Sequence, residues 1–228
     1  SFSCKALVLG SIDCEMTGLN PDTEVTKGAI AELVGALERH KGFAVLGPRL
    51  LNQDGSPQPS VFTFSSPIND LLAWVRSLRR GTAKRLTCGG GSPVEVEAVS
   101  GASMAVRSRA LDECGFMDAS FFMYSEEADL CFRLRQLGWA IGHYDGAPVV
   151  HVGGGSAASA RSRTYVEHRL SRVRFVHKHH GRLAAVMSAF YVIAGMGLRA
   201  CLHRSVWQFR ALAAFLRALW QVRRGRWS

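Results

Sequence analysis

Apolar residues recur along the chain at two spacings, one typical of helices and one typical of strands. From Ile30 they fall at i, i+3, i+4 and i+7, which predicts a helix over residues 27–40 with Thr26 as its N-cap. The same periodicity predicts helices over residues 68–80, 108–114 and 126–137. Short apolar or alternating runs predict strands over residues 5–12, 43–47, 94–99, 139–144 and 148–152. Helices that alternate with short strands are typical of an α/β layer architecture.

The pattern changes past Gly155. Residues 162–180 predict a basic helix, and residues 183–198 form a run of 16 residues without charge. That run is shorter than the roughly 20 residues that a membrane span needs. Further helix is predicted beyond it, with basic residues along one face and apolar residues along the other. The basic positions are Arg199, His203, Arg210 and Arg217, and the apolar ones are Leu202, Val206, Phe209, Leu216 and Trp220.

The charge of the chain is unevenly divided. Residues 152–228 hold 14 of the 28 Lys and Arg residues and one of the 18 acids, Glu167, so this tail carries +13 and the rest −3. We expect residues 160–228 to bind an anionic membrane surface as a basic amphipathic helical tail. The alternative is a helix that packs on the core with its arginines in solvent.

The cysteines and the start of the chain add a prediction of location. The six cysteines are scattered, with no C-x-x-C pair, which indicates reduced thiols. No signal peptide is recognised in the first residues. We therefore expect a cytoplasmic protein, peripheral at the inner face of the cell membrane.

Three segments could carry chemistry, and the first is residues 20–24. Asp22 follows Pro21 in a turn, just before the predicted helix, and a carboxylate there suits Mg²⁺ or Mn²⁺. The same residues are also common in turns that bind nothing.

The second segment is residues 121–131, where three carboxylates follow an aromatic cluster. Glu126, Glu127 and Asp129 begin the predicted helix, and the helix dipole alone favours acids there. A dry aromatic wall beside a carboxylate also raises its pKa, as a general base requires. The two interpretations are equally favoured by these residues alone.

The third segment contains His151, at the end of an apolar strand. A single histidine in such a place is more often structural than a ligand. The three glycines that follow at 153–155 leave room for a phosphate, which favours a ligand role.

Taken in order, these segments and the residues between them resemble family 2 (GT-A-type) glycosyltransferases, and rhamnosyltransferase-like ones in particular. The resemblance extends over roughly residues 19–183. The motifs are N-P-D-T-E at 20–24, G-A at 101–102, G-F-M-D at 115–118, F-F-M-Y-x-E-E-x-D-L-C-x-R-L-R at 121–135, G-W at 138–139 and V-V-H-x-G-G-G-S at 149–156.

The resemblance implies a fold and a role for each matching residue. The fold is a GT-A-like (Rossmann-like) mixed sheet flanked by helices. Asn20 and Asp22 match the family's metal and diphosphate motif, and His151 matches a further metal ligand. Glu127 matches the general base, with Glu126 as the second candidate. The cofactor would be Mg²⁺ or Mn²⁺.

The resemblance also implies substrates and a domain plan. The donor would be a UDP- or dTDP-sugar, the acceptor a glycan or lipid-linked molecule of the cell surface, and the reaction inverting. Residues 19–159 would form the acceptor-side half of the enzyme, and residues 160–228 the tail. Residues 1–18 match nothing in the family, so we expect the chain to lack most of the nucleotide-binding half.

Two alternatives remain. Residues 12–19 resemble the first motif of DEDD-type 3′–5′ exonucleases, in which Asp13 and Glu15 would bind two metal ions. The later motifs of that family, H-x-x-x-x-D and Y-x-x-x-D, are missing, and we do not expect nucleic acid as a partner. The other alternative is a catalytically inactive, membrane-associated module.

Overall fold

The computed structural model describes residues 5–7, 14–19, 22–78, 91–121, 123–152, 161–203 and 206–223. These residues form two compact units. The first, here called the sheet unit, consists of residues 1–64, 85–118 and 126–155, and the second, the helical unit, of residues 65–84, 119–125 and 156–228.

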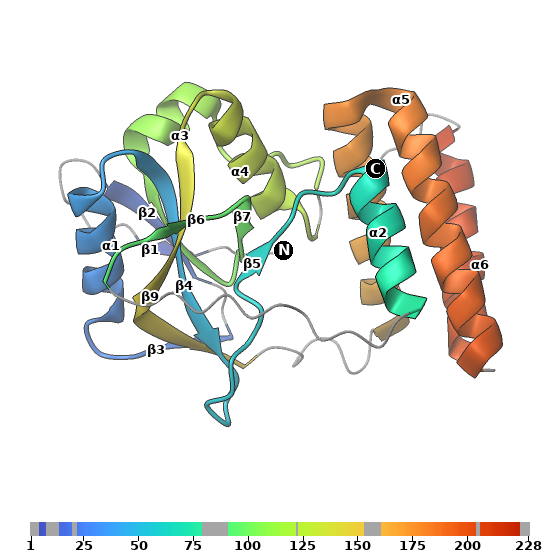
Figure 1. Cartoon of the computed structure of the whole chain (residues 1–228), viewed down its shortest axis with the longest axis horizontal. Helices are drawn as coiled ribbons and strands as arrows, with labels where there is room; N and C mark the ends of the chain where they lie inside the picture. The colour runs from blue at the N-terminus through green and yellow to red at the C-terminus, as the bar shows by residue number, and fades with distance from the viewer. Residues whose placement is uncertain are drawn as a thin grey trace. The chain divides into compact units, whose positions relative to one another are not determined.

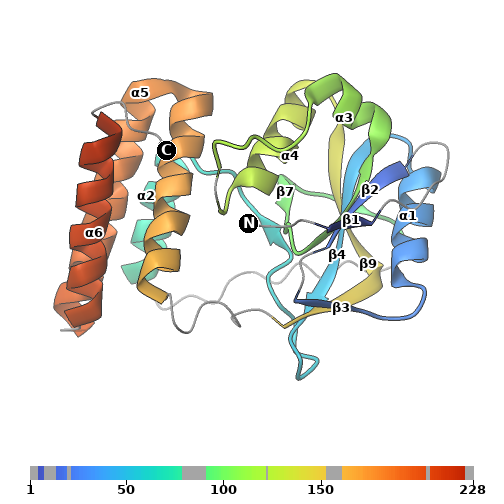
Figure 2. The ribbon, with the colours of Figure 1, turned by 180° about the vertical axis from the view of Figure 1, so that it is seen from behind.

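The sheet unit is built on a mixed sheet of seven strands (Figures 1 and 2). The order along the sheet is β1-β2-β8-β4-β9-β3, and β6 also pairs with β9. β4 and β9 run parallel, and the other pairs are antiparallel. The strands are β1 (Lys5–Leu7), β2 (Cys14–Leu19), β3 (Thr23–Val25), β4 (Phe43–Leu51), β6 (Val94–Glu95), β8 (Ser103–Arg107) and β9 (Ala140–His151). A separate pair joins β5 (Val61–Phe62) to β7 (Ala98–Val99).

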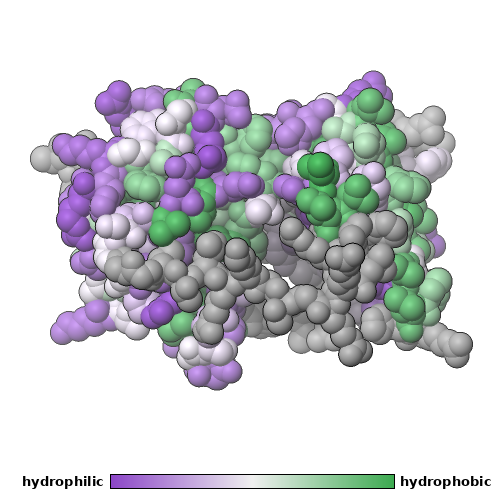
Figure 3. All heavy atoms as spheres, viewed as in Figure 1, coloured by the Kyte–Doolittle hydropathy of each residue, from purple (hydrophilic) through white to green (hydrophobic). Residues whose placement is uncertain are grey.

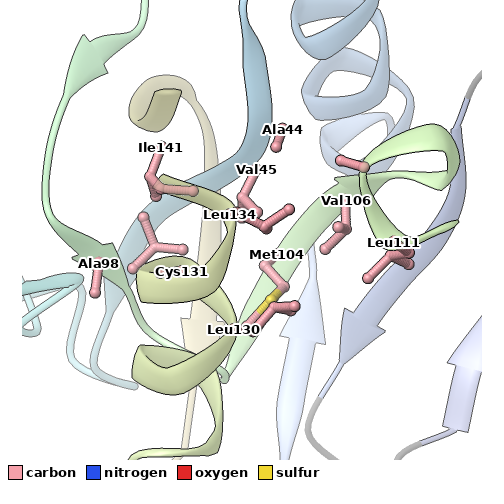
Figure 4. Close-up of a cluster of buried hydrophobic side chains, with 12 residues drawn as sticks. Ala44, Val45, Ala98, Met104, Val106, Leu111, Leu130, Cys131, Leu134 and Ile141 are labelled. Carbon is pink, nitrogen blue, oxygen red and sulfur yellow. The ribbon is translucent and has the colours of Figure 1, made fainter. Parts of the chain in front are cut away.

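Helices cover both faces of this sheet. Successive strand residues point to opposite faces, so Leu46 packs with α1 (Ala29–Arg39) while its neighbour Val45 packs on the other side. On that side the sheet is covered by α3 (Ser108–Cys114) and α4 (Glu126–Gln136). Leu130 and Leu134 of α4 are buried against Met104 of β8 (Figure 4). Two apolar clusters therefore enclose the sheet.

The helical unit contains α2 (Pro67–Leu78), α5 (Arg161–His203) and α6 (Val206–Arg223). Gly181 has φ 84° and ψ 178°, so α5 is two helices joined by a kink. Asp70 of α2 is buried and hydrogen-bonded by Arg172 and Ser188, one from each half of α5. This polar contact holds α2 and both halves of α5 together.

The architecture confirms the predicted α/β class: a mixed sheet flanked by helices, with a helical C-terminal region. Several local expectations were wrong. Thr26 does not cap α1, which begins at Ala29 after Gly28, and the Thr26 hydroxyl donates instead to the carbonyl of Pro148. Residues 94–99 are not one strand but two, β6 and β7, which belong to different sheets.

Two strands are also longer than predicted, because they pair with each other. β4 continues through Pro48, which lies opposite Tyr144, to Leu51. β9 runs from Ala140 to His151 without the predicted break. The strand expected over residues 5–12 is described only at Lys5–Leu7, and the rest lies outside the described residues.

Candidate functional site

Asp22 and His151 lie side by side at one end of the sheet unit. β3 pairs with β9 so that Thr23 is opposite His151, and the Val152 N–H donates to the Asp22 carbonyl at 2.9 Å. The same pairing brings His151 Nε2 within 3.3 Å of Asp22 Oδ1. The sequence predicted that the turn with Asp22 leads directly into a helix. In the structure it leads into strand β3 instead. The structure thus brings together the two residues predicted as metal ligands.

The donor atoms of this pair fit a divalent cation. Asp22 Oδ1 and His151 Nε2 are buried, and neither has a hydrogen-bond partner among the described residues. A carboxylate oxygen and an imidazole nitrogen are both ligands for Mn²⁺, while Mg²⁺ prefers oxygen. No third histidine, cysteine, aspartate or glutamate joins them within the described ranges. A bound cation would therefore fill its other positions with water and substrate phosphate. Asn20, the other predicted residue of this motif, lies outside the described residues.

The two predicted base residues occupy the first turn of α4. Tyr124 and Ser125, directly before them, have φ of 66° and 67°, a left-handed conformation that non-glycine residues seldom adopt. The two residues turn the chain sharply into the helix at Glu126. Backbone strain of this kind gathers at functional sites.

The electrostatics of this turn suit proton transfer. Burial, together with the charge of Glu126, raises the pKa of Glu127 to about 7. Burial also raises the pKa of Glu126. The Oε2 atom of each carboxylate is buried without a hydrogen-bond partner in the described part of the chain. A carboxyl group that titrates near neutral pH and has a free oxygen is able to accept a proton from a substrate.

The third carboxylate of the motif has a structural role. Asp129 is fully buried and accepts a hydrogen bond of 2.8 Å from Arg133 Nε, one helical turn later. Arg133 also donates to the carbonyls of Cys114 and Phe116, at the end of α3. The pair therefore joins α4 to the C-terminus of α3.

A tight loop connects the metal pair with the base. Thr23, next to Asp22, donates its hydroxyl hydrogen to the Ala102 carbonyl at 3.2 Å. The preceding residue, Gly101, packs against Glu127: a Cβ at residue 101 would lie 3.5 Å from the Glu127 Cβ. Gly101 and Ala102 thus lie between Asp22 and Glu127.

Sequence reasoning missed one residue of this site. Gln58 Oε1 lies 2.7 Å from His151 Nδ1, and Gln58 Nε2 donates to the His151 carbonyl at 3.3 Å and to Asn52 Oδ1 at 3.0 Å. Gln58 follows a turn at residues 52–56 and carries no motif of its own. Only the folded arrangement of β4 and β9 shows its role.

The described residues give no support to the alternative exonuclease site at Asp13 and Glu15. Asp13 lies outside the described residues, and Glu15 is in β2, where only the backbone is described. β2 pairs with β1 and β8.

Comparison with known proteins finds similarity to glycosyltransferases. The chain is 29% identical over 133 residues to the low-salt glycan biosynthesis hexosyltransferase Agl10 of Haloferax volcanii, a match that covers 58% of this chain and 40% of that protein. It is 33% identical over 138 residues to N-acetylglucosaminyl-diphospho-decaprenol L-rhamnosyltransferase of Mycobacterium tuberculosis, covering 58% of this chain and 45% of the relative. The chain thus spans less than half the length of the curated relatives it matches. No family model matches it.

Among solved structures, the chain aligns with GalNAc-T7 in complex with UDP, GalNAc and Mn²⁺. The alignment has a TM-score of 0.44 and 16% sequence identity, and it covers 70% of this chain and 30% of that one. Both sequence matches are to glycosyltransferases, so this chain is similar to glycosyltransferases over 58% of its length.

Proposed function

We propose that this relative of glycosyltransferases is the acceptor-side part of an inverting family 2 enzyme, which transfers a sugar from a nucleotide-sugar donor with the help of Mg²⁺ or Mn²⁺. The observation that carries the proposal is the 3.3 Å approach of Asp22 and His151, two residues far apart in sequence. The second support is Glu127, which is linked to that pair through Gly101 and Ala102.

The residues divide the reaction between them. Asp22 and His151 would hold the cation, which, when bound, neutralises charge on the departing diphosphate. Glu127 takes the proton from the acceptor hydroxyl while the oxygen of that hydroxyl forms a bond to the anomeric carbon. The bond from that carbon to the diphosphate oxygen breaks, and the electron pair leaves with the diphosphate. A pKa near 7 leaves Glu127 ionised in a large part of the molecules at neutral pH, as a base must be.

The substrates are proposed by class. We infer a UDP- or dTDP-sugar as donor and a glycan or lipid-linked acceptor. The name of the mycobacterial relative contains a diphospho-decaprenol group and a rhamnosyl group, which supports a lipid-linked acceptor and the transfer of a sugar.

We also infer that the helical unit binds the anionic inner surface of the cell membrane, so that the protein is cytoplasmic and peripheral. Large apolar side chains are exposed on α5 and α6, and hydrophobic residues gather on the visible face of the helical unit (Figure 3). On α5 they are Leu183, Val186, Met187 and Phe190, and on α6 Val206, Phe209, Leu216 and Trp220. One described helix, Arg163–Leu202, is long and apolar enough to cross a membrane by length and composition alone. Its run without charge has 16 residues, fewer than the roughly 20 that a membrane span needs, which favours attachment at the surface.

Calorimetry with UDP and dTDP, each with and without Mn²⁺, tests the main proposal. The wild-type chain should bind a nucleotide only when Mn²⁺ is present. The double variant Asp22→Ala, His151→Ala should lose this binding, since the cation links the protein to the diphosphate. Asp112→Ala, which removes an exposed acid on α3, is the matched control and should bind as the wild type does.

Three outcomes would contradict the proposal. Nucleotide binding of equal strength without Mn²⁺ would remove the role of the cation. Equal Mn²⁺-dependent binding in the double variant would place the cation elsewhere. Absence of any Mn²⁺ or nucleotide binding in the wild-type chain would favour the inactive, membrane-associated module.

A further inference from the structure

We propose that Gln58 is a positioning residue that holds His151 in the tautomer whose Nε2 lone pair faces Asp22, so that the cation site is organised before the cation arrives. This inference rests on the metal role of Asp22 and His151 in the proposed function. It adds a residue, a hydrogen-bond chain and a protonation pattern that the sequence comparison does not supply.

The orientation of the Gln58 side-chain amide follows from its surroundings. Its nitrogen lies 3.3 Å from the main-chain carbonyl oxygen of His151 and 3.0 Å from Asn52 Oδ1. A main-chain carbonyl only accepts hydrogen bonds, so the group that faces it must be the NH₂. The Gln58 oxygen then faces His151 Nδ1 at 2.7 Å. Reversing the amide would set the Gln58 side-chain oxygen against the main-chain carbonyl oxygen of His151, and neither atom can donate.

A turn stabilises this arrangement from behind. Asn52 donates through Nδ2 to Ser56 Oγ at 2.8 Å, and Ser56 Oγ donates to Asp54 Oδ1 at 2.5 Å. Because the Asp54 carboxylate only accepts, every hydrogen bond in the chain points toward it, and Asn52 must present its oxygen to Gln58. The main chain is held too, since Gln58 N–H donates to the Leu50 carbonyl at 2.9 Å.

The consequence for His151 is a fixed tautomer. An oxygen acceptor at 2.7 Å requires the ring hydrogen to be on Nδ1, so Nε2 of the neutral ring carries a lone pair. That lone pair lies 3.3 Å from Asp22 Oδ1, and both atoms are buried without a hydrogen-bond partner in the described ranges. Two electron-rich atoms at this distance repel each other unless a positive charge lies beside both. A hydrogen-bond acceptor on the ring nitrogen that faces away from the cation orients histidine ligands in metal sites generally.

Nitrogen NMR of the metal-free full chain reads the tautomer directly. The protein is labelled with ¹⁵N-histidine and measured at a pH where the ring is neutral, and His151 is identified among the eight histidines by its absence in His151→Gln. The wild type should show hydrogen on Nδ1. Gln58→Met keeps the length of the side chain without an acceptor, and should shift the ring toward a mixture of tautomers. Gln58→Glu keeps an acceptor and should keep the hydrogen on Nδ1.

Mn²⁺ affinity, measured from the electron paramagnetic resonance of free Mn²⁺, is the second readout. Gln58→Met should weaken Mn²⁺ binding roughly 10- to 100-fold, and Gln58→Glu should bind about as the wild type does. Ser60→Ala is the matched control, because Ser60 Oγ supports the same segment through Leu50 N and the Gln58 carbonyl without touching the ring. It should leave the tautomer and the Mn²⁺ affinity unchanged even if it lowers stability.

The outcomes separate this inference from the proposed function. Hydrogen on Nε2 in the wild type, or a Gln58→Met variant with the wild-type tautomer and Mn²⁺ affinity, would overturn the role of Gln58 and leave the metal site standing. Hydrogen on Nδ1 that depends on Gln58, in a chain that binds no Mn²⁺, would support the positioning role and overturn the metal role of the pair.

Discussion

At the scale of single residues, Glu127 couples function to stability. Its pKa rises from an ordinary value of 4.5 to about 7 in the folded chain, chiefly because the group is buried. Below pH 4.5 the carboxyl is protonated in both the folded and unfolded chains, so its burial as a charge costs nothing. Between pH 4.5 and 7 only the unfolded chain releases the proton, and the free energy of unfolding falls. Above pH 7 the whole cost, on the order of 3 kcal/mol, is present.

Glu127→Gln should therefore stabilise the protein at pH 8, by up to ~3 kcal/mol, and change it little at pH 4. Urea unfolding at both pH values measures the difference. Asp112→Asn, an exposed acid, serves as the control and should have a small effect at either pH. Equal effects of Glu127→Gln at pH 4 and pH 8 would show that the carboxyl has an ordinary pKa.

Asp129 and Arg133 lie in the same motif, but removing the charge of Asp129 should lower the free energy of unfolding instead of raising it. Asp129→Asn removes the charge that Arg133 pairs with, at a site where the aspartate is fully buried. We expect a loss of about 2 kcal/mol, less than a fully buried pair would lose, because the Arg133 side chain stays 20% exposed. Mn²⁺ affinity, measured beside stability, should not change. Loss of Mn²⁺ binding with stability intact would move Asp129 into the cation site.

At the scale of elements, the close contact of β4 with β7 depends on a glycine. A Cβ at Gly47 would lie 2.5 Å from the Cβ of Val99, an atom fixed directly to the β7 backbone. Gly47→Ala must push β7 away and should lower the free energy of unfolding by roughly 1–3 kcal/mol. Gly42→Ala, whose Cβ would meet nothing within 4 Å, is the matched control in thermal unfolding. Equal stability of the two variants would mean that β7 moves without cost.

The elements also show what the sequence could predict. Helices were predicted within a few residues because their periodicity is local: α1, expected over residues 27–40, spans Ala29–Arg39. Strand β8 was missed because all five of its residues are buried, so it has no alternation of apolar and polar positions. The break expected within β9 is absent because its pairing with β4 continues beyond it.

The residues of the candidate site likewise differ in whether the sequence could predict them. Asp22 and His151 were predicted as one metal site from motif order, and the structure places them side by side. Gln58 had no signal, since its role depends on how β4 and β9 bring distant segments together.

At the scale of the whole molecule, charge and apolar surface coincide in the C-terminal helices. The tail from residue 152 has 14 basic residues and one acid, and the same helices expose large apolar side chains, among them Leu183 at 77% and Phe190 at 65%. Basic charge attracts an anionic surface over about a Debye length, and apolar side chains hold the helix once it arrives. Both contributions should be measurable separately.

The full chain should sediment with vesicles that contain anionic lipid and much less with neutral vesicles. Raising the salt to about 1 M, where the Debye length is about 3 Å, should release most of the protein. Leu183→Ser with Phe190→Ser should weaken binding at every salt concentration, since it removes apolar contact, whereas Arg210→Gln with Arg217→Gln should weaken it mainly at low salt. The control is Phe116→Ser, which changes an equally exposed apolar residue of the sheet unit, 66% exposed, and should bind normally.

Two outcomes would contradict this prediction. Protein that stays with the vesicles at high salt would mean that the apolar part of α5 is inserted in the lipid. Protein that never sediments with anionic vesicles would leave the exposed apolar face without a membrane role.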